Sequence, residues 1–228
     1  MSDDVAREQR EADVVRLRLG ELYQSPVRGQ FDAAHLKVIH RHLFQDLPHH
    51  QPGVFRKGTR GGWIKQRSLE GQAGAYAVHY ARTAVETRIT RILRAFGGPE
   101  TLKNLTTEEA AARIASLYAD LDHAHGFYEG NSRTLREFMR LLAGEAGYLL
   151  DWGKTAIGSK QRNQLYIARD VAVLERAFPK LTPERAMQTD DRSEYEASFT
   201  LAKLRRAMGQ ASLEVIIRDA MTPESHDP

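Results

Sequence analysis

The sequence predicts an all-α protein, a helical bundle with one short β-hairpin flap and a helical extension at the C-terminus. Apolar residues recur at three- and four-residue steps through most of the chain, as they do on the buried face of an amphipathic helix. Capping residues precede several of these stripes, and glycine or proline follows them. One glycine-rich segment breaks the pattern and is the expected position of the hairpin.

The helices are justified in order by their boundaries. Asp32 is a plausible N-cap for the first stripe, which Pro48 ends. Thr106 and Glu109 have the spacing of a capping box at the start of another helix. Thr182 is the expected N-cap of a later helix that has Pro183 in its first turn. The last apolar stripe, from Tyr195 to Met221, is interpreted as one long terminal helix. The predicted helical stretches are residues 36–47, 85–96, 106–121, 132–146, 165–178, 183 onward and 195–221.

The segment from Pro52 to Val78 carries too many glycines for a helix. Val54-Phe55 and Trp63-Ile64 flank a glycine-rich, cationic turn, and this pattern predicts a short hairpin or an ordered flap. The last residues, from Thr222, are expected to form a loose tail.

Composition limits the possible classes of protein. A chain of 228 residues with 41% hydrophobic and 28% charged residues fits one globular domain with an extra terminal element. The net charge of +3 is compatible with an anionic ligand but is too small to indicate nucleic acid, which is an unlikely partner. The absence of cysteine excludes disulfides and thiolate metal sites. No signal peptide and no membrane-spanning run is recognisable, so a cytoplasmic protein without a membrane partner is expected.

The stretch "HGFYEGNSRTLREF", residues 125–138, concentrates the chemistry. Gly130 begins a turn before a predicted helix, whose free N–H groups form an anion site. Arg133 and Arg136 lie three residues apart on one helix face and can grip adjacent phosphates. The Glu129 carboxylate could hold Mg²⁺ against them, and the His125 imidazole could accept a proton from an attacking hydroxyl.

This stretch resembles the signature of the Fic (Fido) family, His-x-Phe-x-Asp/Glu-Gly-Asn-Gly-Arg-x-x-Arg. The matching residues are His125, Phe127, Glu129, Gly130, Asn131, Arg133 and Arg136. Ser132 stands in place of the second glycine, and Gly126 replaces a frequent proline. The sequences that flank the motif at residues 35–47, 52–56 and 146–152 also resemble those of the family. The resemblance implies a Fic domain over residues 30–178, between an N-terminal helical segment (1–29) and a C-terminal helical extension and tail (179–228).

The resemblance also implies an activity: transfer of AMP from ATP to a hydroxyl of a target protein, with release of pyrophosphate. His125 would then be the catalytic base and Glu129 the Mg²⁺ ligand. Backbone groups of Gly130, Asn131 and Ser132 would form the anion hole. Arg133 would contact the β-phosphate and Arg136 the γ-phosphate. Asn163 and Gln164 are weaker candidates for the edge of the adenine pocket.

Two further expectations concern partners. Many family members restrain themselves with a helix that carries Ser/Thr-x-x-x-Glu, yet no serine or threonine of this chain is followed by glutamate at that spacing. The chain therefore resembles the toxin-like subgroup that a small antitoxin protein restrains. The flap would align the target segment by strand pairing, and its cationic residues would favour an acidic target surface. Those residues are Arg56, Lys57, Arg60, Lys65 and Arg67.

Other interpretations stay open from the sequence. A degenerate Fic fold could bind a nucleotide or a partner without catalysis, and Ser132 is the feature in its favour. A phosphotransferase is less favoured, because the branch of the family with that activity has lysine at position 132. A nucleic-acid-binding module would leave the order of the motif unexplained. The histidines at 35, 40, 42, 49 and 50 suggest a metal site, but no carboxylate cluster accompanies them in the sequence.

Overall fold

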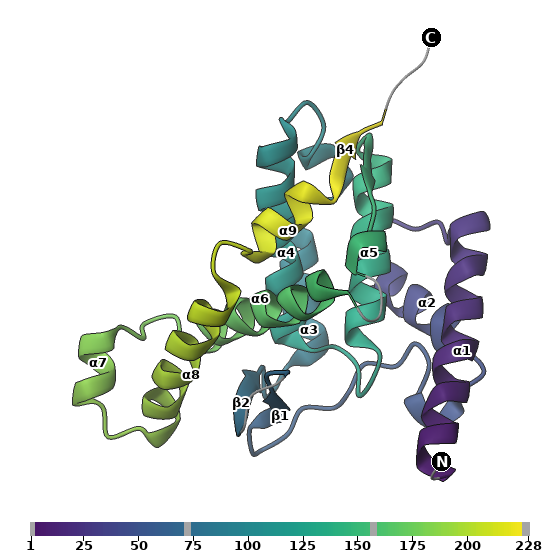
Figure 1. Ribbon diagram of the computed structural model, residues 1–228. Coiled ribbons are helices and arrows are strands. Elements are labelled where there is room, and N and C mark those ends of the chain that lie inside the picture. The colour runs from purple at the N-terminus through teal and green to yellow at the C-terminus, as the bar shows by residue number, and fades with distance from the viewer. Residues whose placement is uncertain (1–2, 71–73, 156–158, 225–228) are drawn as a thin grey trace.

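The computed structural model describes residues 3–70, 74–155 and 159–224 and is mostly helical (Figure 1). α1 stands along one side of the molecule, and α7 and α8 project from the opposite side. None of the described helices combines the length and apolar character needed to cross a lipid bilayer. The helices are α1 (Asp3–Gln24), α2 (Ala33–Phe44), α3 (Val85–Phe96), α4 (Thr107–Ala124), α5 (Asn131–Glu145), α6 (Lys160–Ala177), α7 (Pro183–Gln188), α8 (Arg192–Met208) and α9 (Leu213–Asp219).

Short elements connect these helices. Three 3₁₀ turns are η1 (Pro48–His50), η2 (Pro99–Thr101) and η3 (Gly153–Thr155). β1 (Trp63–Ser68) and β2 (Ala75–Tyr80) form an antiparallel hairpin in which Trp63 pairs with Tyr80. β3 (Tyr148–Leu150) and β4 (Met221–Pro223) form a second antiparallel pair.

α4 lies at the centre of the fold and packs against α3, α5, α6 and α9. Its buried face contributes Ile114, Leu117, Tyr118 and Leu121 to the main core. Residues of α1, α2, α3, α5 and α9 complete this core, so segments from both ends of the chain bury apolar surface together. The predicted division at residues 29 and 178 remains a prediction.

A smaller core joins the hairpin to α6 and α8. The inward residues of β2, including Val78 and Tyr80, pack there against α6 and α8. Tyr76 also donates a hydrogen bond from its hydroxyl to Asp170 of α6 (2.8 Å). The hairpin is therefore anchored on α6, which forms one wall beside the motif.

Two sequence expectations are wrong in their positions. Val54-Phe55 is not a strand; the hairpin strands are β1 and β2, and the turn follows Ser68. Phe55 is instead buried in the main core, and the glycines before Trp63 form the connection that leads into the hairpin. The predicted terminal helix 195–221 is broken at Gly209, which has a positive φ of 59°. The chain then forms α9 and the strand β4.

Three capped helix starts are predicted correctly, whereas α6 and α8 begin before the predicted positions, after the N-caps Ser159 and Asp191. The Asp32 side chain accepts a hydrogen bond from His35 N–H (2.8 Å), and Thr182 accepts one from Arg185 N–H (3.2 Å). At the start of α4, Thr106 and Glu109 bond each other's backbone N–H groups in a capping box. This cap fixes where the central helix begins, and a separate C-cap at His125 ends it at the motif.

We expect Thr106→Ala to lower the free energy of unfolding by about 1 kcal/mol, the usual cost of losing an N-cap side chain. Urea denaturation followed by circular dichroism measures the change. Thr107→Ala is the matched control, because Thr107 is the next residue and its side chain takes no part in the box. A loss in the control as large as that in Thr106→Ala would contradict the assignment of the cap.

Candidate active site

α4 ends at His125, which has left-handed backbone angles (φ 49°, ψ 64°). Such a conformation is costly for a residue with a Cβ and persists only when its surroundings hold it. Arg56 provides the hold: its Nε donates to the carbonyl oxygen of His125 (2.6 Å), and its Nη2 donates to that of Ala124 (3.2 Å). The backbone N–H of Arg56 also donates to the carbonyl of Gly126 (2.8 Å).

The His125 ring is 98% buried and lies between aromatic neighbours. Its centroid is 4.0 Å from that of Tyr80 and 6.4 Å from that of Trp63, both in the hairpin. Neither ring nitrogen has a hydrogen-bond partner among the described residues. Burial, helped by the cations Lys65 and Arg56, holds the pKa of His125 well below its ordinary value. The imidazole is therefore neutral near neutral pH and has a nitrogen free to accept a proton.

The loop after His125 is fixed by side chains that bond its backbone. The Asn131 side chain accepts from Phe127 N–H (2.9 Å) and donates to the Phe127 carbonyl (2.7 Å). His40 Nδ1 accepts from Gly53 N–H (2.9 Å), so its Nε2 carries the proton and donates to the Glu129 carbonyl (3.1 Å). The His40 ring also stacks on Phe127 at 3.7 Å. These contacts hold the loop in one shape.

Gly130 is required for two separate physical reasons. Its φ of 79° lies in the left-handed region, where residues with side chains are strained. A Cβ at this position would also lie 2.2 Å from the ring of Phe44, far inside van der Waals contact. The turn can therefore pass directly over Phe44 only because it has no side chain.

The N-terminus of α5 faces the pocket with backbone N–H groups that have no partner inside the helix. The first intrahelical bond runs from Thr134 N–H to the Gly130 carbonyl (3.0 Å). The N–H groups of Asn131, Ser132 and Arg133 precede that bond and are available to an anion. Glu129 lies beside them and is half exposed; its Oε1 accepts from Gly130 N–H (3.0 Å). Although partial burial opposes ionisation, this bond and the cations Lys65 and Arg133 lower the pKa of Glu129, so it is a carboxylate.

The two motif arginines have different environments. The Arg133 guanidinium lies 4.8 Å over the Phe44 ring and 3.8 Å from the Glu129 carboxylate. Arg136 has no carboxylate within ion-pair distance in the described part of the chain, and its buried Nε lacks a hydrogen-bond partner there. Both arginines line the same pocket. Arg136 is thus a partly buried cation whose Nε–H remains available to donate a hydrogen bond to a ligand.

Ser132 belongs to a network that the sequence does not reveal. Its hydroxyl accepts a hydrogen bond from Arg169 Nη1 (2.8 Å). The same guanidinium donates to both carboxylate oxygens of Asp122, each at 3.0 Å. Arg169 and Asp122 are both buried, on α6 and α4. The serine side chain is therefore tied to α6 rather than left free to crowd the anion site.

Ser132, Arg169 and the predicted site residues of the motif line a hollow of about 740 Å³. The motif forms its floor, the hairpin forms one wall, and α1 forms another through Val15, Leu19 and Tyr23. Trp152, Arg162 and Tyr166 add aromatic and cationic surface. The pocket brings together every predicted site residue, while Phe127 of the motif lies in the core. These site residues are His125, Glu129, Gly130, Asn131, Ser132, Arg133 and Arg136.

Other sequence expectations need correction. Arg56 is buried and holds the motif backbone, so it cannot meet a target surface. Arg67 lies 3.3 Å from the buried Asp170 carboxylate. Of the five cationic residues, Lys57 and Arg60 are exposed, and the other three are buried or partly buried. Asn163 lines a neighbouring hollow, which shares Arg162 and Tyr166 with the motif pocket, and its place at the adenine edge stays a prediction.

The histidines also divide into separate groups. His35 bonds the carbonyl of Val27 and the N–H of Phe31, so it has a structural role. His40 braces the motif loop as described, and burial lowers its pKa to about 4. His49 and His50 lie apart from these, against α1.

Residues 30–143 match the Fic/DOC family. The chain belongs to this family. The match ends within α5 and includes the whole motif, so the geometry above is that of a Fic domain.

Relatives agree with this assignment. The chain is 30% identical over 156 residues to protein adenylyltransferase VbhT of Bartonella schoenbuchensis. The match covers 68% of this chain and 30% of that relative, so the chain spans less than a third of its length.

Solved structures show the same fold. The N-terminal Fic domain of a cell filamentation protein from Bartonella quintana, with bound ADP, has a TM-score of 0.60 at 22% identity. It is matched over 99% of this chain and 89% of its own. BepC of Bartonella tribocorum, with bound AMPPNP, has a TM-score of 0.59 at 19% identity, over 99% and 90% of the two chains.

Sequence reasoning missed Arg169, Asp122 and the α1 wall. Arg169 and Asp122 lie 47 residues apart, and an isolated arginine on a helix is usually a solvated cation. One signal was present: Arg169 falls on the apolar face of its predicted helix, four residues after Leu165, where an unpaired charge would be too costly.

We expect Asp122→Ala to lower the free energy of unfolding by about 3–5 kcal/mol, because it leaves the Arg169 guanidinium buried without its carboxylate. Ser132→Ala removes one hydrogen bond at the pocket edge and should cost about 0.5–1.5 kcal/mol. Denaturant titration of both variants measures the difference. Equal losses would show that the Arg169–Asp122 pair does not carry the network.

Proposed function

We propose that this chain transfers AMP from ATP to a hydroxyl side chain of a target protein and releases pyrophosphate. The observation that carries the proposal is a neutral, buried His125 with free ring nitrogens beside an anion site and two arginines. An uncharged base next to a phosphate-binding turn is the arrangement that hydroxyl attack on a phosphoryl group needs.

The reaction follows from this arrangement. The target hydroxyl loses its proton to His125 as its oxygen attacks the α-phosphorus of ATP. The bond from that phosphorus to the oxygen bridging the α- and β-phosphates breaks, and pyrophosphate leaves with the bonding electrons. The N–H groups of Asn131 and Ser132 stabilise phosphate oxygens. We assign Arg133 to the β-phosphate and Arg136 to the γ-phosphate, because both line the pocket. Arg133 is the one beside the Glu129 carboxylate (3.8 Å), and Arg136 has no carboxylate partner among the described residues.

We assign Mg²⁺ to Glu129. The carboxylate is ionised and half exposed, and it lies at the anion site. Mg²⁺ is usually held by one or two carboxylates together with phosphates and water, which fits a single acidic residue here. When bound, the ion would offset phosphate charge. The Lys65 ammonium lies 3.8 Å from Glu129 Oε2, and Mg²⁺ would replace it as the cation next to this carboxylate.

A catalytically degenerate fold is less well supported. The feature in favour of a degenerate fold was the serine at position 132. Its hydroxyl, however, accepts a hydrogen bond from Arg169, and serine has the same backbone N–H as the glycine of the family motif. His125 and Glu129 also keep the environments that a base and a metal ligand need.

Regulation and location are part of the proposal. Arg136 has no acidic partner in the described residues, so we infer that restraint comes from outside the chain, by a small antitoxin protein that sets a carboxylate against Arg136. A charge-assisted Arg–carboxylate bond of about 1.5–3 kcal/mol can compete with one phosphate contact. We place the reaction in the cytoplasm, where ATP and Mg²⁺ are available, either in the cell of origin or after delivery into another cell.

Incubation with α-³²P-ATP or γ-³²P-ATP and cell lysate tests the reaction. Label from the α position alone should reach protein, and His125→Ala should lower the rate about 10²–10⁴-fold while ATP still binds. His123→Ala is the matched control, because His123 lies two residues earlier on α4 and outside the pocket. Transfer of γ-label would indicate a phosphotransferase, and no label on any protein would indicate a binding module.

Glu129→Gln should reduce the gain in ATP affinity that Mg²⁺ provides, since a neutral amide is a weaker ligand for this ion than a carboxylate. Calorimetric titration of ATP with and without Mg²⁺ measures that gain. Glu145→Gln, at the exposed far end of α5, is the control. An unchanged Mg²⁺ effect in Glu129→Gln would remove this residue as the ligand.

A further inference from the structure

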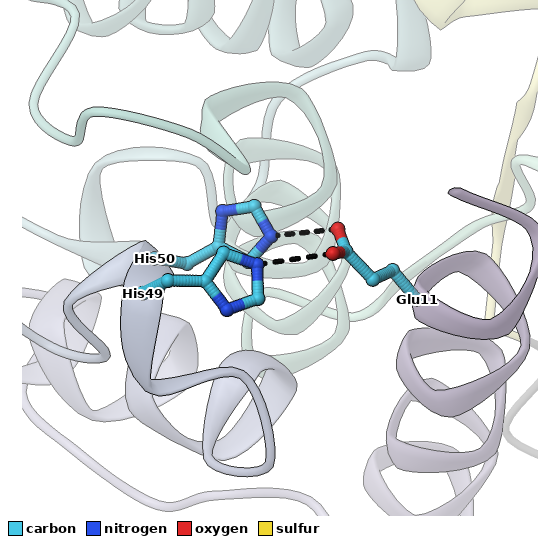
Figure 2. A group of neighbouring side chains, drawn as sticks. All are labelled: Glu11, His49 and His50. Carbon is cyan, nitrogen blue, oxygen red and sulfur yellow. Dashed lines mark hydrogen bonds and ion pairs between the residues drawn. The ribbon is translucent and has the colours of Figure 1, made fainter. Parts of the chain in front are cut away.

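Glu11, His49 and His50 meet at a point where α1 lies against η1 (Figure 2). His49 Nε2 lies 3.0 Å from Glu11 Oε1, and His50 Nε2 lies 3.1 Å from Glu11 Oε2. In Figure 2 both imidazole rings turn their Nε2 atoms toward the single carboxylate. The fold thus supplies the carboxylate that the sequence lacks next to these histidines.

The three side chains form a compact set of donor atoms. One nitrogen from each histidine and one carboxylate oxygen all lie within 4.8 Å of one another. Zn²⁺ binds imidazole nitrogen at about 2.0–2.1 Å and carboxylate oxygen at about 2.0–2.2 Å, usually with tetrahedral geometry. Small side-chain rotations would bring these donors into such a shell, and the His49 side chain, 57% exposed, leaves room for water as a fourth ligand.

The Glu11 carboxylate supplies the negative charge at this point, and both histidines contact it. The Arg7 guanidinium, one turn earlier on α1, lies 4.0 Å from Glu11 and is largely exposed.

We propose that Glu11, His49 and His50 bind a divalent transition-metal ion of the Zn²⁺ type. Imidazole donors select Zn²⁺ and its neighbours over Mg²⁺, which prefers oxygen ligands. This site is therefore chemically distinct from Glu129. It stands on its own donor atoms and does not depend on the proposed function.

The ion would link α1, through Glu11, to η1, through His49 and His50. α1 contributes Val15 and Leu19 to the wall of the pocket. On the other side, the His50 ring packs edge-on against Phe44 (5.5 Å), and Phe44 lies under Arg133 (4.8 Å). A metal at this junction would fix both the wall and the ring that supports a motif arginine.

Calorimetric titration of tag-free, nucleotide-free protein with ZnCl₂ tests the site. We expect one Zn²⁺ per chain and no heat from MgCl₂ at these residues. Glu11→Gln and His49→Ala should each weaken Zn²⁺ binding by at least about tenfold, the smallest loss typical for groups that support a metal site. Glu11→Gln keeps a hydrogen-bond acceptor, so loss of binding in it reflects loss of the charged ligand.

His42→Ala is the matched control. His42 Nε2 lies 3.2 Å from Glu21 Oε2, so the variant removes another histidine–glutamate contact between α2 and α1. It should bind Zn²⁺ like the wild type. Hydrogen exchange should also show that Zn²⁺ slows exchange in α1 of the wild type and not of Glu11→Gln. Absence of Zn²⁺ binding, wild-type affinity in Glu11→Gln and His49→Ala, or an equal loss in His42→Ala would overturn the proposal.

Discussion

The candidate site depends on one sharp connection, the reversal of the chain between α4 and α5. Both ends of this reversal have left-handed backbone angles, at His125 and at Gly130. Such a turn would be loose unless its carbonyl groups were bonded, and Arg56 and His40 bond them from inside the protein. With the carbonyls held inward, the N–H groups at the start of α5 are left facing the pocket. The anion site is thereby organised before any ligand arrives.

The charges around this turn serve two purposes. Lys65, Arg56, Arg169 and Arg67 act with burial to keep His125 neutral, which the proposed role as a base requires. In the proposed reaction, the cations that line the pocket also attract the phosphates of ATP. Asp122 compensates the charge of Arg169, so the guanidinium can be buried against the motif at an acceptable free-energy cost.

The helix α1 completes the pocket although it lies outside the segment that matches the family. It is tied to the body by Arg18–Asp46 ion pairing (2.6 Å) and by the Glu11 contacts to His49 and His50. A change in how firmly α1 is held would change the wall of the nucleotide-sized hollow. In the proposal above, a metal ion at the junction of α1 and η1 would hold this wall in place.

The sequence by itself determined the helical class, the capped helix starts, the family and the motif residues, because these depend on local spacing and on chemistry within a dozen residues. It placed Trp63-Ile64 correctly in a hairpin strand but took Val54-Phe55 for the other strand, because the position of β2 depends on pairing with β1 and packing on α6. It also treated Arg56 as a surface cation, since a charged residue in a glycine-rich loop usually is one. Only the tertiary structure brought Arg169 to Asp122, Arg56 to the end of α4 and Glu11 to two histidines. Each of these contacts joins residues far apart in the chain, and no local pattern records which distant charge a buried group will meet.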